Sequence, residues 1–277
     1  MDVRPSPLFP VLAVALAAAC GGPGAAARPD RPGDPPAARA GARPPPGPLP
    51  PDPPPGLVAA LPGPTRARLV ERAAAWLGHR GAFAAGGRTF RPDCSGFVEA
   101  VYEASGIPMR DAVAVREEDG GSAAMALRRE VQALGVLYGA EREPLPGDLV
   151  FFEDTWDRNG NGRRDDGITH AGLVTAVLPD GTVEFVHRGG RGVSRARLHL
   201  GTPDLPRTRD GEVRNSPLRV ARRPDPRASP ALAGQLFAGF GRIDPARVAA
   251  VLEGNERLDL GVLGLAEGPP LQLHIRP

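Results

Sequence analysis

Apolar residues follow a helical spacing in the first part of the ordered sequence and a strand-like spacing afterwards. Apolar positions recur every three or four residues within 65–77, 94–105 and 123–137, which predicts three amphipathic helices. Thr65 precedes the first of these segments and is a candidate N-cap. The chain therefore starts its folded part near residue 65.

The later segments have the composition of strands. Leu149–Phe152 is a short apolar run, and the β-rich runs 168–178 and 182–187 are joined by Pro179-Asp180-Gly181, which is a hairpin signal. A further helix is expected over 232–240, whereas residues 244–277 stay unassigned. Helices followed by strands indicate an α+β fold with helices packed on an antiparallel sheet, here over residues 65–243.

The first 20 residues have the pattern of a secretory signal peptide. Arg4 precedes an apolar stretch from Leu8 to Ala19 that is too short to span a membrane and remain there. The residues before Cys20 resemble a bacterial lipobox, in which the cysteine is lipidated and becomes the mature N-terminus. The alternative is ordinary signal cleavage after Ala19 or after the alanines at 25–27.

Glycine and proline are concentrated in the segment that follows the signal. The chain has 36 Gly and 34 Pro among 277 residues, more than a single compact domain accommodates. Much of the excess lies in 21–64, which is too poor in large apolar residues to form a core and is predicted to be a disordered linker. A membrane-tethered domain that must reach a cell wall would use such a linker, and the alternative is a low-complexity tail without a function.

Charge and cysteine content exclude several classes of protein. The formal net charge is only +2, which gives no electrostatic basis for binding nucleic acid. No long apolar run follows the signal, so a polytopic membrane protein is excluded. The chain has two cysteines, which cannot build a disulfide framework.

Cys94 is the residue with the strongest chemical context. It follows a proline and a glycine-rich turn and starts a predicted helix, where the helix dipole lowers a thiol pKa and backbone N–H groups can receive an oxyanion. A single buried cysteine is more often an inert small hydrophobe. The polar neighbours Asp93 and Ser95 favour a position at the boundary of the core.

Four motifs around this cysteine resemble the NlpC family of bacterial cell-wall cysteine peptidases. In chain order they are DCSGFV at 93–98, PGDLVFF at 146–152, THAGLV at 169–174, and Val186-His187 followed by Gly192-Val193. The resemblance implies a papain-like α+β fold with the nucleophile at a helix N-terminus. It also implies cleavage of peptidoglycan stem peptides, typically between D-Glu and diaminopimelate, by a periplasmic or outer-membrane enzyme of the cell envelope that needs no cofactor.

The same resemblance implies roles for individual residues. Cys94 would be the nucleophile, His170 the general base, and His187 the group that orients His170. Asp93 and Ser95 match positions that in some relatives hold the free amine of the stem peptide. The tyrosine that often precedes the nucleophile in the family is replaced here by Phe83, which removes a hydroxyl from the substrate site.

Ideal hairpin geometry separates the two histidines. A hairpin centred on Asp180-Gly181 places His187 opposite Val174, four residues from His170, which is about 13 Å along a strand. Strong twist or a β-bulge is needed to bring the rings together.

A polar segment from Asp157 to Asp165 resembles an EF-hand-type calcium loop. Oxygen-bearing residues stand at its positions 1, 3, 5 and 9 and glycine at position 6, but position 12 is Ile168 in place of the bidentate glutamate. The alternative is a polar excursion between two strands.

Two other functions remain compatible with these motifs. A thiol amidase or acyltransferase would use the same residues on the same fold. A lipoprotein that binds peptidoglycan without cleaving it would be the non-enzymatic alternative.

Overall fold

The computed structural model describes residues 60–109, 121–219 and 230–262, with side chains described up to residue 254. The signal segment with Cys20, nearly all of the linker at 21–64, and the last part of the tail lie outside these residues. Among the helices described, none is both long and apolar enough to cross a membrane.

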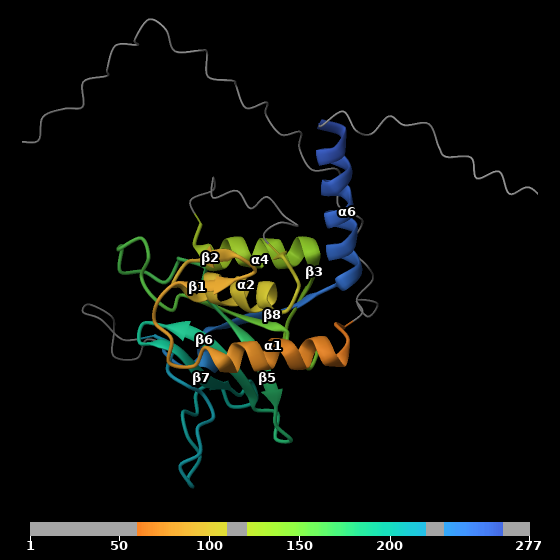
Figure 1. The fold of residues 1–277 in the computed structure, drawn as a ribbon. Coiled ribbons are helices and arrows are strands. Elements are labelled where there is room, and N and C mark those ends of the chain that lie inside the picture. The colour runs from red at the N-terminus through yellow and green to blue at the C-terminus, as the bar shows by residue number, and fades with distance from the viewer. Residues whose placement is uncertain (1–59, 110–120, 220–229, 263–277) are drawn as a thin grey trace, which may run out of the picture. The chain divides into compact units, whose positions relative to one another are not determined.

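A six-stranded antiparallel sheet forms the centre of the fold, with the strand order β3-β8-β4-β5-β6-β7 (Figure 1). Its strands are β3 (Gly135–Tyr138), β4 (Leu149–Glu153), β5 (Ile168–Val177), β6 (Val183–Gly189), β7 (Gly192–Leu198) and β8 (Phe237–Ile243). The short strands β1 (Phe83–Ala85) and β2 (Arg88–Phe90) form a separate hairpin. The helices are α1 (Gly63–Ala75), α2 (Cys94–Ala104), α4 (Ala123–Leu134), α5 (Ala233–Leu236) and α6 (Pro245–Val262). This arrangement confirms the predicted α+β class.

Two apolar clusters cover the sheet. The larger joins α1, α2 and α4 to strand residues such as Phe151, Leu173 and Val186. The smaller packs α5 against residues that include Val150 and Phe185. Because the side chains of a strand alternate between its faces, β4 contributes to both clusters. The helix α2 therefore lies directly against the sheet (Figure 1).

Two predicted helices are shorter than the sequence pattern suggested. The helix from Ala123 ends at Leu134, because Gly135 continues into β3 and a Cβ there would stand 1.9 Å from the carbonyl oxygen of Arg242. The helix expected over 232–240 is restricted to Ala233–Leu236, and the residues after it form β8 between β3 and β4. A short apolar run fits either a helix or a central strand, so pairing decided the outcome.

The two ends of the domain also differ from the expectation. The first helix begins at Gly63 with Pro62 as its N-cap, two residues before Thr65. Residues of the unassigned tail form α6, and its Val248 is buried in the larger cluster.

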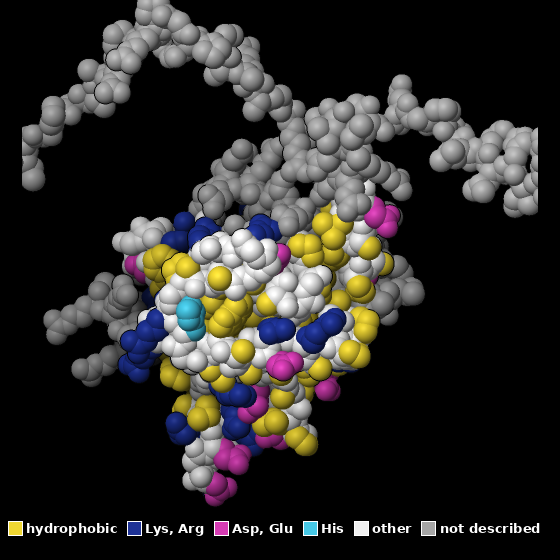
Figure 2. All heavy atoms as spheres, viewed as in Figure 1, with side chains coloured by type: hydrophobic (Ala, Val, Ile, Leu, Met, Phe, Trp, Pro, Cys, Tyr) yellow, Lys and Arg dark blue, Asp and Glu magenta, His cyan; other side chains and the backbone are white. Residues whose placement is uncertain are grey.

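Both signs of charge are spread over the face shown in Figure 2, as the small net charge leads one to expect.

A buried ion pair holds the start of β4. The Asp148 carboxylate accepts hydrogen bonds from Nη2 of Arg242 on β8 at 2.8 Å and from the Tyr138 hydroxyl on β3 at 2.5 Å. It also accepts from the backbone N–H of Leu145, at 2.8 Å. In the preceding turn the Gly147 carbonyl accepts the hydroxyl of Tyr102 from α2. The Pro-Gly-Asp turn thus joins three strands and α2.

Candidate active site

Cys94 is the first residue of α2, and the local sequence explains why the helix starts there. Asp93 is the N-cap, since its Oδ1 accepts the backbone N–H of Gly96 at 2.8 Å. Gly96 lets the preceding loop cross the first turn closely, because a Cβ at this position would lie 2.2 Å from the carbonyl oxygen of Arg91. The motif therefore holds the thiol at the N-terminal end of α2.

The thiol is buried and surrounded by backbone donors. Burial raises the pKa of Cys94 to about 11. The backbone N–H of Ala171 hydrogen-bonds the sulfur and acts in the opposite direction, whereas the nearby charge of Asp93 raises the pKa further. The N–H groups of Ser95 and of Cys94 itself also favour the thiolate. The sulfur thus lies beside β5, next to the residue that follows His170.

His170 stands near the start of β5 with a partly exposed imidazole. Desolvation, and in second place the adjacent His187, lower the pKa of His170 well below its usual range. Its ring packs against Phe152 on β4, with the centroids 6.2 Å apart. The N-cap of α4, Ser122, donates a hydrogen bond to the Ile168 carbonyl and ties this end of β5 to a helix. His170 is therefore neutral near pH 7 and held by packing.

His187 on β6 contacts His170 directly. Nε2 of His170 and Nδ1 of His187 are 2.7 Å apart, and the rings meet edge to face. A β-bulge reduces the separation that an ideal hairpin would leave, because Val174 pairs with Phe185 but Ala176 pairs with Glu184, so Thr175 is the extra residue. With Leu173 opposite Val186, His187 stands opposite Gly172, two residues from His170, and the two rings meet across this diagonal. The expectation that the two rings come within hydrogen-bonding distance is confirmed.

Of the two residues predicted to bind substrate, Ser95 is buried and Asp93 is partly exposed. Ser95 is fully buried, and its hydroxyl donates to Asp93 Oδ1 at 2.7 Å. Asp93 keeps part of its carboxylate exposed, with Oδ2 3.4 Å from Nε of Arg91. Ser95 therefore supports Asp93, and only Asp93 of the two faces solvent.

Phe83, for which the resemblance implied a tyrosine, occupies a packed aromatic cluster. Its ring is fully buried between Trp76, His79 and Phe97, with centroid distances of 5.2, 5.2 and 5.7 Å. The side chain fills the core at this position and carries no polar group.

Two histidines outside the motifs make local contacts in the structure. Nε2 of His79 lies 2.9 Å from the Ala82 carbonyl, and the ring of His199 hydrogen-bonds Asp180 and Thr202. His274 lies outside the described residues. These contacts are those of structural histidines.

The segment expected to bind calcium is held by its own hydrogen bonds. Asp157 Oδ2 accepts the N–H of Gly162, and the Asp165 carboxylate accepts the side-chain amides of Asn159 and Asn161. Within the described part of the chain, no three His, Cys, Asp or Glu side chains are grouped so as to hold a metal ion. Calcium binding at this loop stays a prediction.

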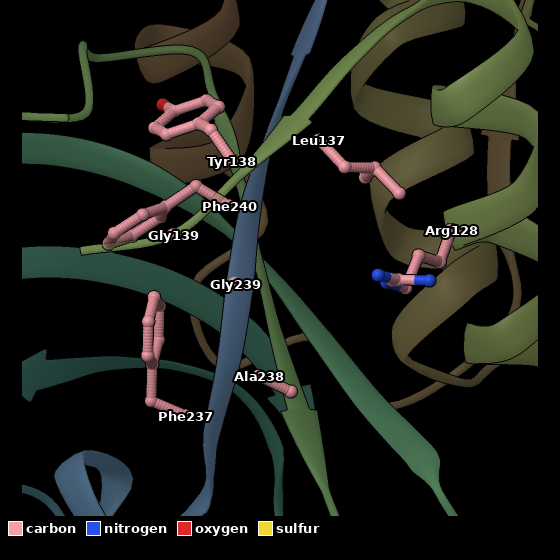
Figure 3. A pocket seen from close by; sticks show the side chains of 8 residues that line it. All are labelled: Arg128, Leu137, Tyr138, Gly139, Phe237, Ala238, Gly239 and Phe240. Carbon is pink, nitrogen blue, oxygen red and sulfur yellow. The ribbon is translucent and has the colours of Figure 1, made fainter. Parts of the chain in front are cut away.

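A separate pocket lies beside the edge strand β3 and its neighbour β8, and it holds none of the predicted site residues (Figure 3). It has a volume of about 430 Å³, and Arg128 supplies its charged side chain. Its lining residues are Arg128, Leu137, Tyr138, Gly139, Phe237, Ala238, Gly239 and Phe240.

In a comparison with known protein families, the NlpC/P60 family matches residues 80–202. This region contains Cys94, His170 and His187 and confirms the resemblance drawn from the four motifs. A solved structure of a "similar to lipoprotein, NLP/P60 family" protein from Staphylococcus aureus subsp. aureus Mu50 is 20% identical, with a TM-score of 0.31. The match covers 50% of this chain and 38% of that chain. A search of the curated proteins found no match.

Proposed function

With residues 80–202 assigned to the NlpC/P60 family, we propose that this chain is a peptidoglycan endopeptidase that uses Cys94 as its nucleophile. Its target is the stem peptide, at the bond between D-Glu and diaminopimelate. The observation that carries the proposal is the 2.7 Å contact between His170 and His187 beside the sulfur-bearing end of α2. A nucleophile, a base and a group that orients the base are the parts that covalent peptide hydrolysis requires.

The protonation states favour a general-base mechanism from a neutral pair. Because burial raises the pKa of the thiol and lowers that of His170, both groups are neutral near pH 7. His170 removes the thiol proton as the sulfur attacks the peptide carbonyl carbon, and then gives this proton to the leaving amine as the C–N bond breaks. The resulting thioester is hydrolysed by water, again with His170 as the base.

Backbone groups at the start of α2 supply the electrostatic part of the reaction. The first helical turn has unsatisfied N–H groups that point toward developing negative charge. Gly96 and Phe97 already donate to Asp93, whereas the N–H groups of Cys94 and Ser95 face the sulfur. These two donors, with that of Ala171, are suited to stabilise the tetrahedral oxyanion.

Asp93 is the group proposed to recognise the substrate. An exposed carboxylate next to the nucleophile attracts the free ammonium of a stem peptide. Ser95 holds this carboxylate in place from the buried side.

A product analysis tests the proposed function. The purified full-length chain is incubated with defined muropeptides, and the products are identified by mass spectrometry. New termini at D-Glu and diaminopimelate support the proposal, whereas cleavage at an amide outside the stem peptide or transfer to an added amine would indicate an amidase or an acyltransferase. Binding of peptidoglycan without any product would indicate the non-catalytic alternative.

Substitution of His187 is expected to slow the reaction without removing the base. His187→Ala should lower kcat by about 10- to 100-fold, and less than His170→Ala does, because a misoriented base is still present. His187→Asn or His187→Gln, which keep a hydrogen-bonding group, should recover part of the activity. Steady-state kinetics on a muropeptide check this order, and wild-type turnover by His187→Ala would assign the orienting role to another group.

We also propose that Cys20 is lipidated and anchors the protein in the cell envelope. The lipobox-like residues before Cys20 and the proline-rich linker after it motivate this proposal. In cell fractionation the wild-type protein should partition with membranes, whereas Cys20→Ser should become soluble or stay unprocessed. An unmodified N-terminus downstream of Cys20 in the native protein would contradict it.

A further inference from the structure

The loop between β4 and β5 holds two carboxylate oxygens that receive no hydrogen bond from the described part of the chain. These atoms are Oδ1 of Asp157 and Oδ2 of Asp166, and both are completely buried. Residues 158–163, which lie between the two side chains, are themselves exposed, so the oxygens are buried within a surface loop. A buried carboxylate oxygen without a donor is costly and calls for a bound water or ion.

The second oxygen of each carboxylate fixes its orientation. The backbone N–H of Gly162 donates to Oδ2 of Asp157 at 2.9 Å, and that of Asn159 donates to Oδ1 of Asp166 at 3.1 Å. Both side chains are thus held against the same short segment, 159–162, from its two ends. Two negative charges held in this way repel each other unless a cation neutralises them.

The arginines of the loop do not supply this cation. Among the residues that the structure describes, no salt bridge includes Asp157 or Asp166. Arg164 is directed elsewhere, since its Nη1 donates to the Pro230 carbonyl and its Nε lies 3.9 Å from Oδ2 of Asp154. The two carboxylates are therefore available to a metal ion.

We propose that residues 157–166 bind a calcium ion, with Oδ1 of Asp157 and Oδ2 of Asp166 as its two carboxylate ligands. Asp166 stands at position 10 of the loop and supplies the carboxylate that the calcium-loop pattern lacks at position 12, where Ile168 stands. The side-chain oxygens of Asn159 and Asn161, at positions 3 and 5, are the neutral ligands. Each accepts one backbone N–H within the loop, and an amide oxygen has a second lone pair for an ion.

The donor set selects calcium among the common metal ions. It contains two carboxylates and neutral oxygens, and it needs no third carboxylate, imidazole or thiolate. Calcium accepts about six to eight oxygen ligands in variable geometry, whereas magnesium requires a regular octahedron. Zinc and copper favour imidazole and thiolate groups, and residues 157–166 include neither histidine nor cysteine.

The base of the loop connects this site to the strand of the proposed general base. The N–H of Asp166 donates to Oδ1 of Asp154 at 2.9 Å, and the N–H of Thr155 donates to the hydroxyl of Thr169 at 2.8 Å. Thr169 directly precedes His170 on β5. Calcium therefore stabilises the end of β5 that carries His170, without contacting the reacting groups.

Terbium luminescence tests the site directly. Trp156 precedes Asp157 and is 48% exposed, so an excited Trp156 should transfer energy to Tb³⁺ bound in place of calcium. The purified full-length chain should show this emission and lose it when excess calcium is added. Asp157→Asn and Asp166→Asn should each weaken terbium and calcium binding by about tenfold or more, whereas Asp210→Asn, at an exposed position outside the loop, should bind as wild type does.

Two further samples locate the ion and identify it. Trp156→Phe should lose the emission but keep its response to calcium in thermal unfolding. Absence of emission from the wild type, full emission from Asp157→Asn, or displacement of terbium by magnesium as effectively as by calcium overturns the inference.

Thermal unfolding distinguishes an ion site from a purely structural role of the carboxylates. Millimolar calcium should raise the Tm of the wild-type chain by about 5 °C over its value in chelator, and should leave that of Asp157→Asn unchanged. In chelator, Asp157→Asn should be at least as stable as wild type, because it removes one of two repelling charges. A variant that is less stable in chelator and still responds fully to calcium overturns the inference. Neither measurement uses hydrolysis, so the result is independent of the proposed function.

Discussion

Cys94→Ala is expected to abolish peptidoglycan hydrolysis while the domain stays folded. Without the sulfur no thioester forms, and the remaining imidazoles and backbone donors cannot replace the covalent route. Turnover of muropeptides should fall on the order of 10⁴-fold or more, to the limit of detection by mass spectrometry. The side chain lost is small and stands at a helix start, so thermal unfolding should change little.

The second cysteine provides the matched control for this variant. Cys20→Ser, purified without a lipid, should retain full hydrolysis, and a thiol-alkylating reagent should still inactivate it through Cys94. Wild-type turnover by Cys94→Ala would contradict the peptidase assignment. A variant that unfolds at the same temperature but has no activity supports it.

Asp148→Ala is expected to destabilise the fold strongly. Asp148 is buried with Arg242, and the substitution would leave that guanidinium and the Tyr138 hydroxyl without their shared acceptor. Removal of one partner from a buried ion pair costs about 3–5 kcal/mol, a large part of the roughly 5–15 kcal/mol that stabilises a typical domain. Urea unfolding followed by circular dichroism measures the change in the free energy of unfolding.

An exposed aspartate provides a control that distinguishes loss of the buried Asp148 network from loss of one negative charge. Asp210→Ala removes the same side chain from an exposed position and should leave the free energy of unfolding within about 0.5 kcal/mol of wild type. Equal stability of the two variants would show that the Asp148 network contributes little. Asp148→Asn, which keeps the shape but not the charge, should fall between Asp148→Ala and wild type.

Local pattern was sufficient for the parts of the structure that depend on neighbouring residues. The helix that starts at Cys94 follows from the capping aspartate and the apolar spacing of the residues after it. The hairpin from β5 to β6 follows from the turn at Asp180-Gly181 between two β-rich runs. Four motifs in one order also identified the family and the three residues proposed for catalysis.

Pairing between distant strands decided what local pattern left ambiguous. The segment 237–243 has an apolar content that fits a helix, and it is a strand because it bonds to β3 and β4 on its two edges. Likewise, Gly135 ends a helix early because the backbone of β8 passes where a side chain would stand. Neither neighbour is close in the sequence, so no short window contains the reason.

The sequence by itself determined the fold class and singled out the cysteine and the two histidines proposed for catalysis, because each has a local signature of residue type and spacing. Only the tertiary structure decided whether the histidines meet, since an ideal hairpin keeps them four residues apart, whereas the observed register with its bulge at Thr175 reduces the offset to two residues, which the two rings span. It also placed Ala171 at the sulfur. A bulge and a cross-strand contact are decided by how whole strands pack, because the energy of one register over another is summed along the full length of both strands.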